Sequence, residues 1–333
     1  MTPESFRCFL VRKTGNDKIE AGVESCPLRD LADGDVLIRV RYSSLNYKDT
    51  MAAAGHPGVA RKFPHVPGID AAGVVEQSSS PLFQVGDEVI ATGHELGVER
   101  YGGWAEYVRV PAEWVVKRPE GLSLEQSMIL GTAGFTAAQC VRALQHHGVQ
   151  PGQDEIVVTG ATGGVGSLAV MLLAKLGYAV IAVTGKSSRA DWLKALGATR
   201  VAGRDEFTDD GRKPLLTARY AAAVDTVGGA MLTHVIKSLK QRGCVTACGM
   251  VAGAELPLTV YPFILRGVTL AGIDSAWCPE DQRAEIWRML ATDWKPNRLS
   301  ELVTLVGLDS IGAAIQRMQR GDHAGRVVVK ISH

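Results

Sequence analysis

Residues 156–167 read Ile-Val-Val-Thr-Gly-Ala-Thr-Gly-Gly-Val-Gly-Ser and decide the fold. The first three are apolar and β-branched, which is typical of a buried strand. The glycines that follow predict a tight turn, and residues 165–176 then carry apolar side chains at helical spacing. A strand, a glycine-rich turn and a helix in this order predict a dinucleotide-binding unit.

The turn itself suits a pyrophosphate, because it directs backbone N–H groups and the positive end of a helix at one spot. Against the fingerprint G-x-G-x-x-G, Gly163 and Gly166 fall in register, whereas Ala161 takes the first position with Gly160 just ahead. An ordinary strand-to-helix turn is the alternative. The strand before the motif and the helix after it favour the nucleotide site.

The end of the second strand indicates which dinucleotide binds. Residues 178–183 predict a strand, and an NAD site would place Asp or Glu at its end to bind the ribose 2′-hydroxyl. Residues 184–189 read Thr-Gly-Lys-Ser-Ser-Arg instead. Two cations and two serines suit a 2′-phosphate, so we predict NADPH as the cofactor. Alternatively, a serine there only caps the next helix, with the cations solvated.

Length and composition exclude several classes of protein. A chain of 333 residues with 46% hydrophobic content predicts two domains with packed cores. A net charge of +1 gives no reason to expect nucleic acid or an anionic membrane as a partner. We found no signal peptide and no long apolar run, so we expect a cytoplasmic protein. The six cysteines form no C-x-x-C pair and are interpreted as core thiols.

Short strands separated by turns fill the first 125 residues and predict a compact β-rich unit. Its longest loops, residues 45–68 and 92–104, are the expected functional end. The predicted strands are residues 6–12, 36–42, 71–76, 88–91 and 105–110.

From Ser123 the pattern changes to helices and strands in alternation. One helix begins at Ser123, a second follows Gly131 and runs to about His146, and six strands with helices between them predict a doubly wound parallel sheet. A helix at 311–320 and a strand at 326–331 then return to the β-rich unit. We therefore expect a β-rich catalytic domain over 1–125, an NADPH-binding domain over 126–293 and a return over 294–333.

Several motifs resemble the medium-chain dehydrogenase/reductase superfamily along essentially the full chain. They include Ser-Leu-Asn-Tyr-Lys-Asp at 44–49, Pro-Gly-Ile-Asp at 67–70, Gly-Gly-Trp-Ala-Glu-Tyr at 102–107 and Gly-Thr-Ala-Gly-Phe-Thr-Ala at 131–137. The resemblance is to the zinc-free quinone-oxidoreductase-like group, and residues 262–268 and 272–275 are most similar to its acryloyl-CoA reductase branch. It implies an α/β protein with a β-rich GroES-like catalytic domain and a doubly wound Rossmann domain.

The residues argue against a catalytic zinc, which needs three converging ligands. Zinc-dependent relatives carry a cysteine where Asn46 stands and Gly-His-Glu where Gly68, Ile69 and Asp70 stand. We therefore predict no metal. Without a Lewis acid for a carbonyl, an activated alkene is the easier hydride acceptor.

The resemblance also implies site residues. Asn46, Tyr47 and Arg326 are the expected catalytic group. Arg204 is expected beside the 2′-phosphate, unless it pairs with Asp205 or Glu206, and Met250 beside the nicotinamide, unless it fills the core. The full set of expected cofactor contacts is Tyr47, Thr162, Gly163, Gly164, Val165, Gly185, Lys186, Ser187, Arg204, Met250, Leu265, Ser275 and His323.

The leading hypothesis is NADPH-dependent reduction of a short enoyl-CoA, acryloyl-CoA to propanoyl-CoA, with Asn46 or Arg326 stabilising the enolate oxygen and Arg61 and Lys62 meeting the phosphates of coenzyme A. Quinone reduction and a non-catalytic NADPH-binding role are the alternatives. The loop 55–58 lacks the tyrosine of mitochondrial-type enoyl reductases, so the sequence identifies no proton donor. We also expect a homodimer, because residues 268–273 end one side of the sheet.

Overall fold

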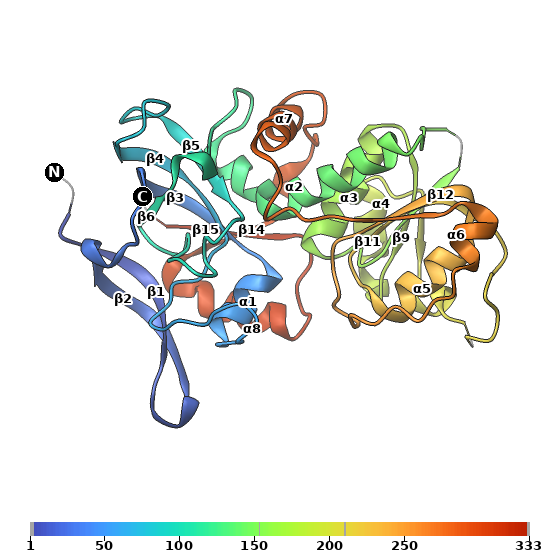
Figure 1. The fold of residues 1–333 in the computed structure, drawn as a ribbon, viewed down its shortest axis with the longest axis horizontal. Coiled ribbons are helices and arrows are strands. Elements are labelled where there is room, and N and C mark those ends of the chain that lie inside the picture. Colours follow the sequence, from blue (N-terminus) through green and yellow to red (C-terminus); the bar gives the residue numbers. More distant parts are fainter. Residues whose placement is uncertain (1–2, 153, 210, 332–333) are drawn as a thin grey trace. The chain divides into compact units, whose positions relative to one another are not determined.

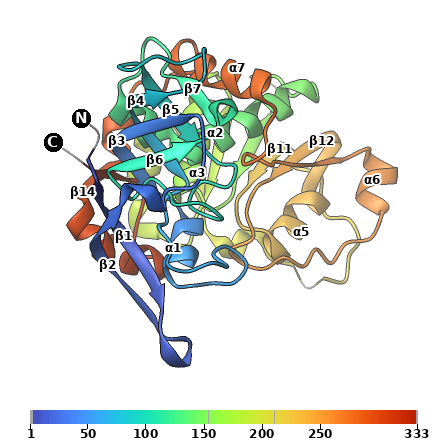
Figure 2. The same ribbon diagram turned by 60° about the vertical axis from the view of Figure 1, so that its left-hand side comes forward.

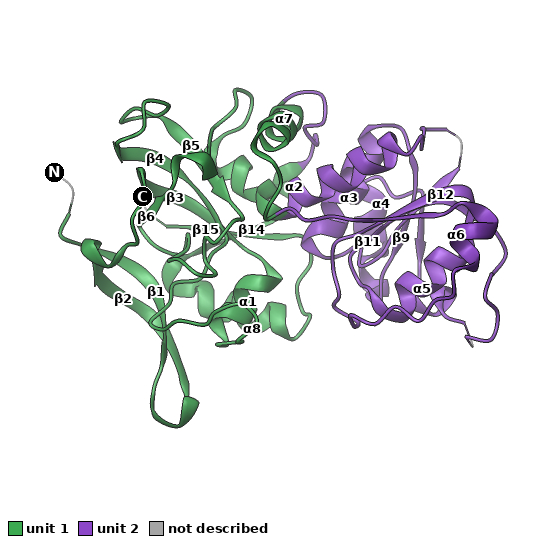
Figure 3. Ribbon diagram, in the orientation of Figure 1, with its two compact units in different colours: residues 1–132, 276–291, 299–333 green, residues 133–275, 292–298 purple. Residues whose placement is uncertain are grey.

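The computed structural model describes residues 3–152, 154–209 and 211–331. The chain folds into two compact units (Figure 3). Unit 1 takes residues 1–132, 276–291 and 299–333, and unit 2 takes residues 133–275 and 292–298. The predicted boundary at 125/126 thus lies seven residues before the unit boundary at 132/133, inside a helix.

Unit 1 is the β-rich unit (Figure 1). Its main sheet has the strand order β14-β15-β3-β4-β5-β7, with β6 paired to β3, and β1 and β2 form a separate antiparallel pair. Its elements are β1 Ser5–Lys13, β2 Ile19–Pro27, β3 Val36–Leu45, α1 Tyr47–Ala53, β4 Asp70–Ser78, β5 Glu88–Thr92, β6 Tyr107–Val110, β7 Val115–Lys117, α7 Glu280–Ala291, β14 Val303–Gly307, α8 Ile311–Gln319 and β15 Arg326–Lys330.

All five predicted strands of this unit are present, and the last strand rejoins it as expected. In register, β15 runs antiparallel to β3, with Val328 opposite Ser44. Helix α8 buries Ile311, Ala314, Ile315 and Met318 against the strands, an apolar face at helical spacing. The sequence missed β2, β7 and β14, because they are short or largely exposed and carry no clear apolar alternation.

Unit 2 contains a six-stranded parallel sheet, as the alternating pattern predicted. Its strand order is β10-β9-β8-β11-β12-β13. Helices α3 and α4 cover one face and α5 and α6 the other (Figures 1 and 2). The elements are β8 Glu155–Val158, α3 Gly164–Lys175, β9 Ala179–Val183, α4 Ala190–Ala195, β10 Arg200–Ala202, β11 Tyr220–Asp225, α5 Gly229–Ser238, β12 Leu239–Ala247, α6 Tyr261–Arg266 and β13 Thr269–Gly272.

Helix α2, Leu124–His146, carries the chain from unit 1 into unit 2. It is broken at Gly131, whose φ of 49° and ψ of −155° are not helical. The break lies where the sequence predicted that one helix ends and a second begins.

None of the helices within the described ranges is both long and apolar enough to cross a bilayer.

Candidate functional site: a nucleotide turn and a buried polar cluster

In unit 2 the glycine-rich turn follows β8, next to the place where the strand order reverses between β8 and β11. Open parallel sheets bind nucleotides at the carboxyl ends of strands at such a point. Gly163 is the N-cap of α3, which begins at Gly164. A Cβ on Gly166 would lie 2.4 Å from the carbonyl oxygen of Gly160, so only glycine fits there. The turn therefore exposes the amino end of α3 as a pyrophosphate site requires.

The strand ends beside this turn are tied together by side chains. The hydroxyl of Thr159 donates to Asp225 Oδ1 at 2.7 Å, and that of Thr226 donates to the Thr159 carbonyl at 2.9 Å. Asp225 Oδ2 accepts from the backbone N–H of Gly228 at 2.7 Å. Burial raises the pKa of the Asp225 carboxyl, and these donors oppose that effect. Asp225 thus caps the turn that follows β11.

The loop after β9 holds the group expected at a 2′-phosphate. The guanidinium of Arg204 lies against Gly185, where a Cβ would come 2.6 Å from Arg204 Nε. Glu206 pairs with Arg200 at 2.7 Å rather than with Arg204. Across the described ranges, the exposed Arg204 makes no hydrogen bond or ion pair within the chain, so its charge is available to a ligand. Arg204 therefore does not form the ion pair with Asp205 or Glu206 that was the alternative role.

The other predicted cofactor residues of unit 2 range from buried to exposed. Thr162 is buried, with its hydroxyl 3.3 Å from that of Thr184. Met250 and Leu265 are 64% and 57% exposed, so neither fills the core. Val165, Lys186 and Ser275 are half-buried, and Ser187 is exposed.

In unit 1 two of the three predicted catalytic residues, Asn46 and Arg326, meet in a largely buried polar cluster. Asn46 precedes α1, and both the oxygen and the nitrogen of its side-chain amide form hydrogen bonds. Its Nδ2 donates to Asp70 Oδ2 at 2.8 Å, whereas its Oδ1 accepts from Arg326 Nη1 at 3.1 Å. The donating end of Asn46 thus faces a carboxylate, which leaves it poorly placed to stabilise an enolate oxygen.

Asp70 is fully buried and accepts from several neighbours. Besides Asn46, the hydroxyl of Thr132 donates to Oδ1 at 2.6 Å and its backbone N–H lies 3.0 Å from both oxygens. The Ser44 hydroxyl makes a further short contact to Oδ2. These donors come from residues 44–46 and from α2, so the carboxylate at the start of β4 joins two other segments distant in sequence.

Arg326 is 2% exposed and donates to backbone carbonyls as well as to Asn46. Its Nε bonds the carbonyl of Ile129 at 2.8 Å, and Nη2 lies 3.5 Å from that of Met128. Burial lowers its pKa, and Asp70 and Asp49 act in the opposite direction. The resemblance implied a direct catalytic donor, but this guanidinium is enclosed by its own chain and holds other residues in place.

Asp49 completes the cluster and is also fully buried. Its Oδ2 accepts from the Asn46 backbone N–H at 2.8 Å and its Oδ1 from that of Ile69 at 2.9 Å. Burial, followed by repulsion from Asp70, raises its pKa to about 7, although the N–H donors favour the ionised form. Asp49 therefore fixes the first turn of α1 to the segment before β4.

Tyr47 differs from these residues, because it is 53% exposed at the start of α1. His323 is half-buried in the loop between α8 and β15. Among the predicted catalytic residues, Tyr47 is the exposed one, whereas Asn46 is half-buried and Arg326 is buried.

A zinc ion does not fit this cluster. Isoleucine and asparagine stand at two ligand positions, and the buried positive charge of Arg326 beside the cluster would oppose a bound cation. Nowhere in the ranges that the structure describes do three potential His, Cys, Asp or Glu ligands converge. His94, in the loop after β5, stacks on Trp114 at 5.0 Å instead, and burial lowers its pKa to about 4.

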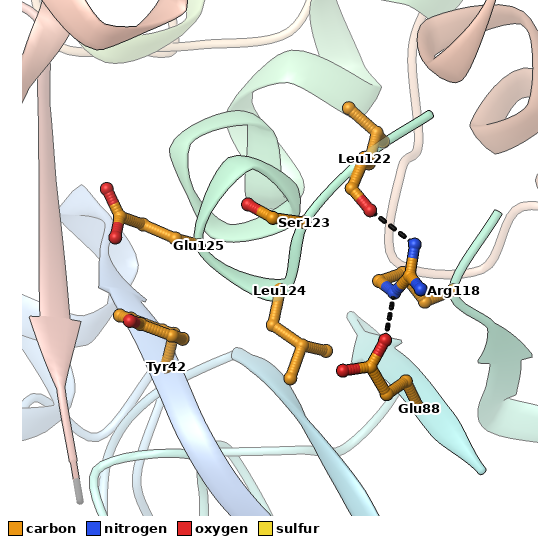
Figure 4. A pocket seen from close by; sticks show the side chains of 7 residues that line it. All are labelled: Tyr42, Glu88, Arg118, Leu122, Ser123, Leu124 and Glu125. Atoms are coloured by element: carbon orange, nitrogen blue, oxygen red, sulfur yellow. Dashed lines mark hydrogen bonds and ion pairs between the residues drawn. The ribbon is translucent and has the colours of Figure 1, made fainter. Parts of the chain in front are cut away.

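A pocket of about 520 Å³ lies elsewhere in unit 1 (Figure 4). Arg118 crosses it between Glu88 and the carbonyl oxygen of Leu122. The other lining residues are Tyr42, Ser123, Leu124 and Glu125. None of the predicted site residues lines this pocket.

Sequence reasoning missed Ser44, Asp70, Gly131 and Thr132 as members of the site. Three of the quoted motifs contain them, but no periodicity shows that these motifs converge. One signal in the sequence could have indicated them: these polar residues and this glycine stand next to the ends of predicted strands and helices, where functional side chains often lie.

Fold and site together define a nucleotide-dependent oxidoreductase with a β-rich unit and a Rossmann unit. The family model "Alcohol dehydrogenase GroES-like domain" matches residues 32–120, and "Zinc-binding dehydrogenase" matches residues 164–292. The chain belongs to the medium-chain dehydrogenase/reductase family, which confirms the predicted family and fold.

Three relatives are similar over nearly the whole chain. Acrylyl-CoA reductase AcuI of Ruegeria pomeroyi is 45% identical, over 98% of this chain and 99% of its own. Putative quinone oxidoreductase YhfP of Bacillus subtilis is 44% identical, with the same coverage, and its crystal structure with NAD has a TM-score of 0.95. The yhdH oxidoreductase of Salmonella enterica in complex with NADP is 44% identical, has a TM-score of 0.94, and covers 97% of this chain and 99% of its own.

Proposed function

We propose that this protein reduces the α,β double bond of a short enoyl-CoA, acryloyl-CoA to propanoyl-CoA, with NADPH and without a metal. The observation that carries the substrate is the 45% identity with acrylyl-CoA reductase over nearly full length. The zinc-free cluster around Asn46 supports the reaction class, because an enoyl thioester needs no Lewis acid at a carbonyl.

NADPH supplies a hydride from the nicotinamide. The residues of unit 2 bind and orient it: the turn at Gly163, Gly164 and Gly166 meets the pyrophosphate, and Arg204 with Lys186 and Ser187 meets the 2′-phosphate. The structure of the Salmonella relative in complex with NADP supports NADPH as the cofactor. Orientation accounts for a large share of such a rate enhancement, since hydride transfer requires close approach of two carbons.

In unit 1 the exposed residue among the predicted catalytic residues is Tyr47. The buried cluster fixes the start of α1, so the exposed phenol projects from a rigid base. Tyr47 is our candidate for contact with the nicotinamide and the acyl group. This role replaces the donor role first given to Asn46 and Arg326, whose polar atoms are already bonded within the cluster.

An assay of NADPH oxidation with acryloyl-CoA, crotonoyl-CoA and a benzoquinone tests the proposal. We expect kcat/KM to be highest for acryloyl-CoA and unchanged after treatment with a chelator. Efficient quinone reduction without turnover of acryloyl-CoA would replace this proposal by the quinone alternative, which the similarity to YhfP favours. Turnover lost on chelation would contradict the absence of a metal.

We also propose a homodimer formed through the β13 edge of unit 2. Strand β13 pairs with β12 on one side and ends the sheet order on the other. Exposed apolar residues of α6 accompany it: Tyr261, Ile264 and Leu265. An exposed apolar sheet edge is normally paired or covered. Light scattering at micromolar concentration should give twice the chain mass, and a monomer would contradict the proposal.

A further inference from the structure

The break in helix α2 is stabilised at both sides by one pair of buried charges. Before the break, the carbonyls of Met128 and Ile129 accept from Arg326. After it, the N–H and hydroxyl of Thr132 donate to Asp70. Cations favour the carboxyl end of a helix and anions the amino end, so each half receives the charge that suits its dipole.

Glycine at position 131 is required for this arrangement. Its φ of 49° is unfavourable for residues with a Cβ. A Cβ would also lie 2.6 Å from Asp70 Oδ2, 3.0 Å from Arg326 Nη2 and 3.2 Å from Ser44 Oγ. The backbone break therefore creates the space in which the two charged groups meet the helix.

Arg326 and Asp70 also form hydrogen bonds with opposite ends of the Asn46 side-chain amide. Arg326 donates to Oδ1 at 3.1 Å and Asp70 accepts from Nδ2 at 2.8 Å. An amide with a cation at its oxygen and an anion at its nitrogen has one preferred orientation. The flipped form would place the NH2 group against the guanidinium and the oxygen against the carboxylate. Asn46 directly precedes Tyr47, the exposed first residue of α1.

We propose that Asp70 and Arg326 are a positioning pair for the reduction: they couple the break in α2 to the orientation of Asn46 and thereby fix Tyr47 for the hydride-transfer step. Neither side chain touches the substrate in this account. The inference rests on the proposed function for its kinetic readout, and on the cluster alone for its structural readout.

Asp70→Asn tests the pair, because it keeps the shape but turns an acceptor into an amide facing the N–H groups of Asn46 and Thr132. We expect kcat to fall about 10- to 100-fold, with the Kd of NADPH changed less than about threefold, since the residues proposed to bind its phosphates lie in unit 2 and are left intact. Hydrogen exchange should accelerate both in residues 44–53 and around the break at 131. Asp87→Asn is the matched control: Asp87 caps a turn of unit 1 through Gln84 and should change neither readout.

Ser44→Ala is the milder variant should Asp70→Asn fail to fold. It removes one donor to Asp70 and one acceptor of Asn46, and we expect kcat to fall several-fold in a fully folded protein. Wild-type kcat and wild-type exchange in the folded variant would overturn the proposal. If the wild-type enzyme reduces none of the acceptors, the proposed function fails. Hydrogen exchange in residues 44–53 and around residue 131 would still test whether Asp70 and Arg326 couple these two segments.

Discussion

The two candidate site regions satisfy their charges in opposite ways. In unit 1, Asp70 and Arg326 are buried and bonded to their own chain. In unit 2, Arg204 is exposed beside Gly185 and makes no bond within the described chain. The first arrangement stabilises a conformation, whereas the second leaves charge for a phosphate. Substitutions in unit 1 should therefore change stability, and those at Arg204 should change ligand affinity.

The largest effect on stability is expected for Arg326→Ala. Removing the guanidinium leaves Asn46 Oδ1 and the Ile129 carbonyl without their donor in a buried site, and each unsatisfied group costs about 1–3 kcal/mol. Urea denaturation should show this loss in the free energy of unfolding. A change below about 1 kcal/mol would show that the cluster is not closed as described.

Arg204→Ala is expected to act on the ligand instead. Loss of a charge-assisted bond to the 2′-phosphate should weaken NADPH binding about 10- to 100-fold and leave NADH binding unchanged. Fluorescence titration with both cofactors measures this, while the thermal midpoint should match that of the wild type. Equal losses for NADPH and NADH would place Arg204 away from the 2′-phosphate.

The elevated pKa of Asp49 predicts a pH dependence of stability. Because the folded pKa is about 7 and the unfolded value is near 3.8, the folded state retains a proton that the unfolded state releases between these values. Stability from this group is present at low pH and declines as the pH rises toward 7, by at most about 1.4 kcal/mol per pH unit. Asp49→Asn should flatten that part of the profile in denaturation curves at pH 4–8. An unchanged slope would contradict the pKa.

The smallest effect is expected at the substrate rim. Arg61 is exposed and, among the described residues, makes no ion pair, so Arg61→Ala should raise KM for acryloyl-CoA about 3- to 10-fold with little change in kcat. The increase should shrink at high salt because the interaction is screened. A matched assay with an acryloyl thioester of pantetheine, which lacks the nucleotide, should show no difference between variant and wild type.

The two site regions also differ in how far their sequence predicts them. The nucleotide turn and its strand and helix lie within residues 155–175, so local spacing is enough to predict them. Ser44, Asp70, Thr132 and Arg326 come from four distant segments, and only tertiary packing brings them together. The break at Gly131 was predictable, since a glycine there separates two helical patterns, but the buried charges on either side of it were not. Exposed strands such as β2 lack the apolar alternation on which prediction depends.

Transfer of deuterium from NADPH to the product tests the central claim most directly. NADPH labelled at C4 of the nicotinamide is incubated with the enzyme and acryloyl-CoA, and the propanoyl-CoA is examined by mass spectrometry and NMR. We predict one deuterium per product molecule on the β carbon, from whichever face of the nicotinamide is transferred. Deuterium at the α carbon, or product without label from both C4 epimers, would contradict direct hydride transfer to the double bond.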